Sequence, residues 1–156
     1  MSEPPGQQAQ MSREGQGGGR RRGDCVIGVC DPQRAQGLRA PAPEGDHVLV
    51  DLDGPGTFVA AEVTKQGGAA GDITFVILDI DGRNVVNVSY AAARNFGLLQ
   101  QNPFGLVLLE TPQTATIKNL TIGFPTPLRY EESLKLSVVV REPGVVQVLA
   151  NVIHGS

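Results

Sequence analysis

The stretch SLKLSVVVREPGVVQVLANVI, residues 133–153, decides how this chain folds. Its first half carries leucine or valine at every even position from 134 to 140, with polar residues at 133, 135, 137 and 141. Its second half places Val146, Val148, Ala150 and Val152 on one face. Pro143 and Gly144 stand between the halves, where Pro fixes φ and Gly accepts a positive φ. A period of two is typical of half-buried strands, so the stretch predicts a β-hairpin that closes the chain.

Further strand patterns extend upstream of this hairpin. They are separated by turn signals and lie at residues 48–53, 57–64, 73–80, 85–88, 106–109 and 114–124. Residues 73–80 are apolar on both faces, which predicts a central strand covered on both sides. Asp81-Gly82 follows directly and is a strong signal for a type I′ hairpin turn.

Three local features refine this pattern. Ser89 is placed to cap one short helix over residues 91–94, which Gly97 would end. In residues 114–124 the apolar phase slips after Ile117, which predicts a β-bulge near residues 118–119. The two prolines in residues 124–127 have no N–H to donate, so this segment is expected to be a connection or an edge.

Together these patterns predict an all-β domain over residues 46–156. About eight short strands with one helical turn favour an antiparallel, two-sheet β-sandwich of jelly-roll-like design over βαβ units. Residues 1–45 are rich in Gly, Pro, Gln and Arg, and they offer little apolar area to offset chain entropy. We therefore predict a disordered arm before the domain.

The arm carries three short motifs. The arginine run at 20–22 is interpreted as a solvated charge run, and the Arg-Gly-Asp tripeptide at 22–24 as a chance match to integrin ligands. Cys25 and Cys30 are separated by four residues, so they could close a small disulfide ring or offer two thiolates to a metal. A second ligand pair is missing, and unreactive thiols are the simpler interpretation. Whether the two cysteines pair stays open.

The charge and composition of the chain limit the classes of partner that it can bind. Residues 46–156 hold seven basic and eleven acidic residues, a net charge of −4, and aromatic residues make up only 4% of the chain. Nucleic acid is therefore an unlikely partner. No apolar run approaches the roughly 20 residues that span a membrane. The N-terminus has no apolar segment typical of a signal peptide, so we expect a cytoplasmic or virion location.

One pair of acidic residues is a candidate for cation binding. Asp79 and Asp81 share a face at a strand end and could bind a hard cation, although the further ligands of a calcium loop are missing. The ordinary interpretation is a strand end followed by a turn. No nucleophile motif is present, and most aromatic residues are interpreted as core. We predict no catalytic residues and no cofactor.

The run LTIGFPTPLRYEESLKL, residues 120–136, resembles a segment of small β-sandwich proteins that decorate phage heads, tails and fibres. The resemblance implies a structural protein of a virion or similar particle. Our first hypothesis is a non-enzymatic structural or assembly subunit that forms homo-oligomers. The alternative is a module that binds carbohydrate or another surface ligand through loops at one end of the sandwich. A third possibility is an enzyme with a carboxylate pair assembled in space.

Overall fold

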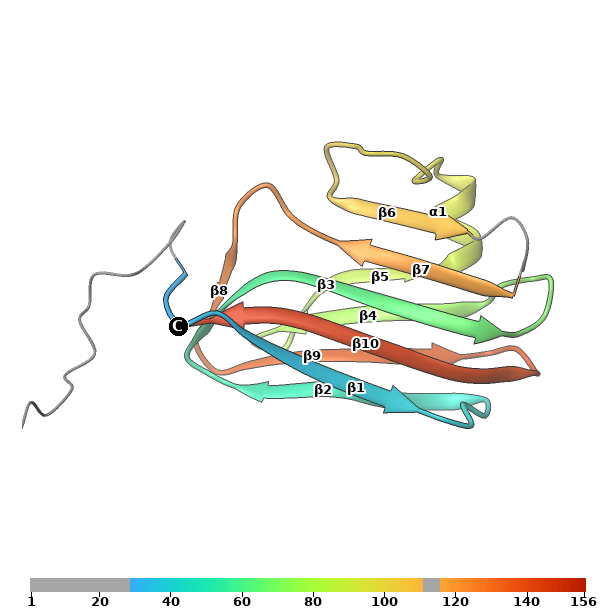
Figure 1. Cartoon of the computed structure of the whole chain (residues 1–156), viewed down its shortest axis with the longest axis horizontal. Coiled ribbons are helices and arrows are strands. Elements are labelled where there is room, and N and C mark those ends of the chain that lie inside the picture. The colour runs from blue at the N-terminus through green and yellow to red at the C-terminus, as the bar shows by residue number, and fades with distance from the viewer. Residues whose placement is uncertain (1–28, 111–115) are drawn as a thin grey trace, which may run out of the picture.

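The computed structural model describes residues 29–110 and 116–156, which form two stacked β-sheets and one short helix (Figure 1). The elements are β1 (Gln33–Arg39), β2 (Gly45–Asp53), β3 (Gly56–Gly67), β4 (Thr74–Ile80), β5 (Arg83–Ser89), α1 (Tyr90–Asn95), β6 (Leu106–Glu110), β7 (Ile117–Ile122), β8 (Leu128–Tyr130), β9 (Ser133–Val140) and β10 (Val145–Gly155). The helix is too short to cross a membrane, and no other helix in the described ranges is long and apolar enough to do so.

The strand order is that of a jelly roll. The larger sheet runs β1-β10-β3-β7-β6, with β8 also paired to β3, and the smaller sheet runs β2-β9-β4-β5. All pairs are antiparallel, and the chain repeatedly crosses from one sheet to the other. The predicted all-β, two-sheet sandwich with one short helix is confirmed.

The turn and cap chemistry also matches the sequence. Asp81 and Gly82 both have positive φ, 51° and 71°, as a type I′ turn requires, and Ile80 pairs with Arg83 across it. The Ser89 hydroxyl accepts a hydrogen bond from the Ala92 amide at 3.0 Å and caps α1. These features depend on neighbours in sequence, which is why they were predictable.

The core lies between the two sheets and is built from the inward residues of each strand. Its fully buried members include Phe58, Val63, Val76, Leu78, Tyr90, Leu120, Ile122, Leu134, Leu136, Val138, Val148 and Val152. Burying such side chains stabilises a fold by roughly 1.5–3 kcal/mol each. The predicted burial of β4 on both faces is wrong, because Phe75 and Ile77 on its outer face stay partly exposed.

The predicted boundary at residue 45 is also wrong, because β1 belongs to the domain. Its residues pair with β10 from Gln33↔His154 to Arg39↔Val148. A Cβ at Gly37 would lie 2.0 Å from the Leu49 backbone oxygen, so β1 and β2 approach too closely there for any other residue. This contact joins the two sheets along one edge.

At the opposite edge α1 lies between the sheets, beside β6 and β5 (Figure 1). The predicted bulge at residues 118–119 is absent, since β7 pairs with β3 in unbroken register from Ile117 to Ile122. The segment 123–127 is a connection, as expected, and β8 after it is a short strand that the sequence pattern did not reveal.

Candidate functional site

Two lysines occupy the core face of the larger sheet. Lys65 follows Ala61 and Val63 on the inward face of β3, and Lys118 precedes Leu120 on the inward face of β7. The two lysines are direct cross-strand partners. Two like charges side by side in a core destabilise it unless anions compensate them.

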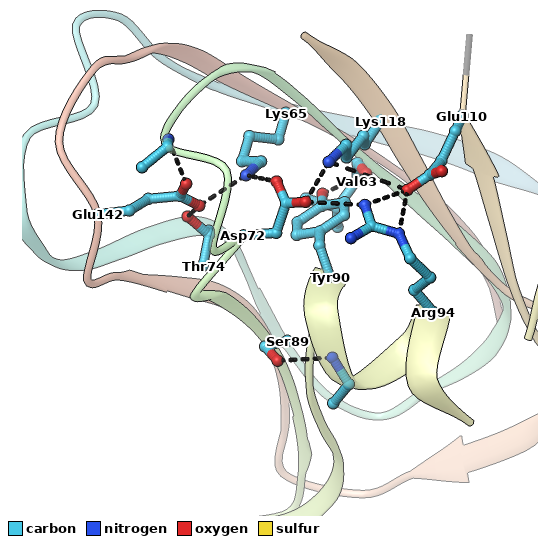
Figure 2. A network of polar contacts seen from close by, with 12 residues as sticks. Val63, Lys65, Asp72, Thr74, Ser89, Tyr90, Arg94, Glu110, Lys118 and Glu142 are labelled. Atoms are coloured by element: carbon cyan, nitrogen blue, oxygen red, sulfur yellow. Dashed lines mark hydrogen bonds and ion pairs between the residues drawn. The ribbon is translucent and has the colours of Figure 1, made fainter. Parts of the chain in front are cut away.

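Asp72 and Glu142 supply those anions (Figure 2). The Lys65 Nζ lies 2.9 Å from Asp72 Oδ1 and 2.6 Å from Glu142 Oε1. The Lys118 ammonium group donates to the other oxygen of Asp72. Each carboxylate therefore accepts a charge-assisted hydrogen bond inside the sandwich.

Neutral groups complete the environment of Glu142. The Thr74 hydroxyl donates to Oε1 at 2.5 Å, and the Ala69 backbone amide donates to Oε2 at 2.7 Å. Glu142 belongs to the turn between β9 and β10, whereas Thr74 begins β4. The carboxylate thus links the smaller sheet to the β3–β4 connection.

Arg94 from α1 closes the outer side of this cluster. Its Nη2 donates to Asp72 Oδ2 at 2.8 Å, and its Nε donates to Glu110 Oε1 at 3.0 Å. These hydrogen bonds, first with Glu110 and then with Asp72, raise the pKa of the guanidinium. We call Lys65, Asp72, Arg94, Glu110, Lys118 and Glu142 the charge cluster. It holds three cations and three anions.

Tyr90 packs beneath the charge cluster at the start of α1. Its hydroxyl donates to the Val63 carbonyl at 2.7 Å, and its ring centroid lies 5.1 Å from the Lys65 Nζ. Burial, followed by the negative charges of Glu142 and Asp72, raises the pKa of Tyr90. The phenol therefore stays protonated and serves as a hydrogen-bond donor.

The electrostatics of Asp72 show how completely the charges compensate. Burial by itself would raise the pKa of this carboxyl, but hydrogen bonds from Lys118, Lys65 and Arg94 outweigh burial and hold the pKa at about 2. Within the described residues, every buried side-chain nitrogen and oxygen has a hydrogen-bond partner. The charged groups of the cluster thus pair with one another. Their contacts hold β3, β7, α1 and the β9–β10 turn together.

The predicted cation candidates lie elsewhere and serve the turn. The Asp81 carboxylate accepts the backbone amides of Glu131, Glu132 and Ser133 at 2.8–3.1 Å, and these hydrogen bonds lower its pKa. Asp79 Oδ1 accepts from the Asn84 side chain at 3.0 Å. In the described part of the chain, no group of three or more His, Cys, Asp or Glu side chains is arranged to hold a metal.

The histidines and cysteines are not brought together. The His47 Nε2 lies 2.6 Å from the Pro43 carbonyl oxygen, whereas the His154 Nδ1 is 3.5 Å from the Tyr130 hydroxyl. Cys30 is disulfide-bonded, so the prediction of an unreactive thiol is wrong for it. Cys25, the arginine run and the Arg-Gly-Asp tripeptide lie outside the described residues.

A hollow of about 450 Å³ opens beside α1, at the edge where β5 ends the smaller sheet. We call it the apolar groove, and its lining residues are Val85, Val86, Asn87, Val88, Phe96, Leu98, Phe104 and Leu106. Phe96 is 74% exposed and Phe104 is 69% exposed, so these two are exceptions to the expected placement of most aromatic residues in the core.

Backbone contacts fix the wall of the apolar groove. The Leu108 amide donates to the Leu98 carbonyl at 2.6 Å, and the Gly123 amide donates to the Gly105 carbonyl at 2.7 Å. The loop that carries the two phenylalanines is therefore attached to β6 and β7.

The sequence holds one signal for the charge cluster. Lys118 shares the parity of Leu120 and Ile122, so an inward lysine, and not a phase slip, accounts for the apolar pattern of β7. A scan of protein-family models and a search of curated proteins found no match to this chain.

Proposed function

We propose that this protein is a non-enzymatic structural or assembly subunit, of virion or particle type, that associates with a second copy of itself through the apolar groove. The observation that carries the proposal is the exposure of two phenylalanines beside a preformed groove. Large apolar patches on a soluble protein typically mark sites of association.

Two further exposed apolar side chains support the same surface. Val85 within the groove is 40% exposed, and Leu99 in the adjoining loop is 50% exposed. Aromatic residues that fill a pocket on a partner provide much of the energy of protein interfaces. The fixed loop lowers the entropy that association would cost.

The charge of the groove argues for a second copy as the occupant. None of its eight lining residues is charged, and Asn87 is the one polar member. A charge-free apolar surface can meet its own copy around a two-fold axis without repulsion. An occupant of strong charge would lose hydration here without gaining an opposite charge.

The fold is compatible with this role by analogy alone. Jelly rolls form viral capsid domains and also lectin domains. The charge cluster is compatible with this role, because its charged groups pair with one another and no buried side-chain nitrogen or oxygen of the described residues lacks a hydrogen-bond partner.

The test is the mass of the full chain in solution across a wide range of concentrations, measured by sedimentation velocity. We expect the wild type to dimerise or assemble further, and the double variant Phe96→Ser/Phe104→Ser to remain monomeric. Loss of one buried aromatic anchor typically weakens an interface by roughly 2 kcal/mol or more.

Leu38→Ser is the matched control. Leu38 is 60% exposed and lies on β1, at the far edge of the larger sheet from β6. This variant should associate like the wild type. A wild type that stays monomeric at the highest concentration, or a double variant that associates as well as the control, would overturn the proposal.

A further inference from the structure

The outer face of the larger sheet carries a ladder of hydrogen-bonded polar side chains. The Gln36 side-chain amide donates to Asn151 Oδ1 at 2.7 Å, and the Asn151 amide donates to Glu62 Oε1 at 2.7 Å. Asn119 donates to the other oxygen of Glu62 at 3.3 Å. Four strands, β1, β10, β3 and β7, therefore hold one carboxylate and three amides in fixed orientations.

A hollow of about 320 Å³ adjoins this ladder. Its lining is contributed by Arg34, Ala60, Ala61, Glu62, Thr121, Asn151 and Ile153. The register places Arg34, Ile153 and Ala60 side by side on one rung, with Asn151, Glu62 and Thr121 on an adjacent rung. The small side chain of Ala60 thus lies on the same rung as Arg34 and next to the polar rung of Asn151, Glu62 and Thr121.

The polar groups around the hollow retain capacity for a ligand. The Glu62 carboxylate offers about four acceptor positions, of which the ladder uses two. Asn151 keeps a second N–H and a second lone pair. No side chain in the described ranges pairs with the Arg34 guanidinium, which has five N–H donors.

From this arrangement we propose that the hollow binds a neutral, hydroxyl-rich ligand, such as one ring of a neutral saccharide. Donors on Arg34 and Asn151 and acceptors on Glu62 suit hydroxyl groups, which both donate and accept. The opposite charges of Arg34 and Glu62 cancel, which disfavours strongly charged ligands. Ala60 and Ile153 provide an apolar floor for the C–H face of a ring.

The size of the hollow agrees with a small ligand, because binding pockets usually measure roughly 300–1,000 Å³. The site lies on the sheet face, whereas the sequence-based alternative placed a carbohydrate site in the loops. Binding here does not depend on self-association, since the apolar groove lies at the β5 edge and the hollow lies on the outer face of β1, β10, β3 and β7.

The experiment is an NMR titration of the full-length, ¹⁵N-labelled protein with D-glucose, D-galactose and D-mannose, and with D-glucuronate as a charged counterpart. We expect saturable shifts of the Asn151 side-chain amide and of backbone amides at Glu62 and Thr121 with at least one neutral sugar. The shifts with glucuronate should be weaker.

Two variants locate the site. Ala60→Leu should fill the hollow, and Arg34→Gln should remove one charged donor. Each should weaken binding about tenfold, the usual consequence of losing a charged hydrogen bond or a well-fitted contact. Gln147→Leu is the control, because Gln147 lies on the same strand as Asn151 but pairs with Gln66 outside the hollow.

Saturable shifts whose affinity falls about tenfold in Ala60→Leu and is unchanged in Gln147→Leu would support the site. Absence of a saturable shift with all three neutral sugars would overturn it and would leave the ladder as cross-strand stabilisation only. Binding that Ala60→Leu and Arg34→Gln leave unchanged would also overturn it, because the ligand would then bind elsewhere.

Discussion

The charge cluster and the apolar groove both border α1, but they differ in chemical character. Arg94 in the helix belongs to the charge cluster, and the Tyr90 ring lies against its Lys65 ammonium group. The six charged side chains of the cluster pair with one another. Phe96, directly after the helix, borders a groove in which it, Phe104 and Val85 remain exposed to water. Groups that are satisfied within the chain stabilise the fold, whereas unsatisfied apolar surface is available for a partner. The two regions should therefore respond to mutation in opposite ways.

The largest loss of stability is expected from Glu142→Ala. This change leaves Lys65 short of one anion and deprives the Thr74 hydroxyl and the Ala69 amide of their acceptor. Breaking a buried ion pair on one side typically costs about 3–5 kcal/mol. Denaturant unfolding of the full chain measures this loss in the free energy of unfolding. Glu132→Ala, at an exposed carboxylate, should change the free energy of unfolding by no more than about 0.5 kcal/mol.

Asp72→Asn should have the next largest effect and should change the acid sensitivity. Asn tolerates the positive φ of 50° at this position, so the variant isolates the charge. The folded-state pKa of about 2 lies below the ordinary 3.8, so the ionised carboxylate stabilises the fold above about pH 4. That contribution, about 2 kcal/mol, is lost as the pH falls from about 4 to 2.

Unfolding measured across this pH range tests the assignment. The gap in stability between the wild type and Asp72→Asn should narrow as the pH falls through the window. A gap that stays constant down to pH 2, the folded pKa, would contradict the role of the ionised carboxylate.

Asp81→Asn should destabilise the protein less than either change. Asp81 is partly exposed to solvent, and its hydrogen bonds to the β8–β9 turn are open to competition from water. Its lowered pKa means that the stabilisation is present above the ordinary pKa and is lost as the pH falls. Thermal unfolding with and without CaCl₂ checks both roles. An increase in midpoint with calcium in the wild type alone would favour the cation hypothesis for Asp79 and Asp81.

The smallest effect on stability is expected at the apolar groove. Phe104→Ser removes a side chain that is 69% exposed, so the free energy of unfolding of the monomer should change by no more than about 0.5 kcal/mol. Association should nevertheless weaken. A large loss of monomer stability would place Phe104 among the core residues and would contradict the comparison between the two regions.

Local chemistry explains which elements were predictable. The period of two in β9 and β10, the Asp81-Gly82 turn and the Ser89 cap each depend on residues within a few positions of one another. β1 was missed because its inward positions include Ala35 and Gly37, which give almost no apolar signal. That strand is defined by its pairing with β10, more than 100 residues later in the chain.

The sequence by itself determined the fold class of this protein, because alternation and turn residues specify strands locally. Only the tertiary structure decided where its charges and aromatic side chains lie. A lysine counts as an outward residue in any local pattern, yet the register of β3 and β7 turns Lys65 and Lys118 into the core. Asp72 contacts both lysines and Glu142 contacts Lys65, although the two acids lie 7 and 77 residues from Lys65 in the chain, respectively. Phe96 and Phe104 are exposed for the same reason, since burial depends on what the rest of the chain places over a side chain.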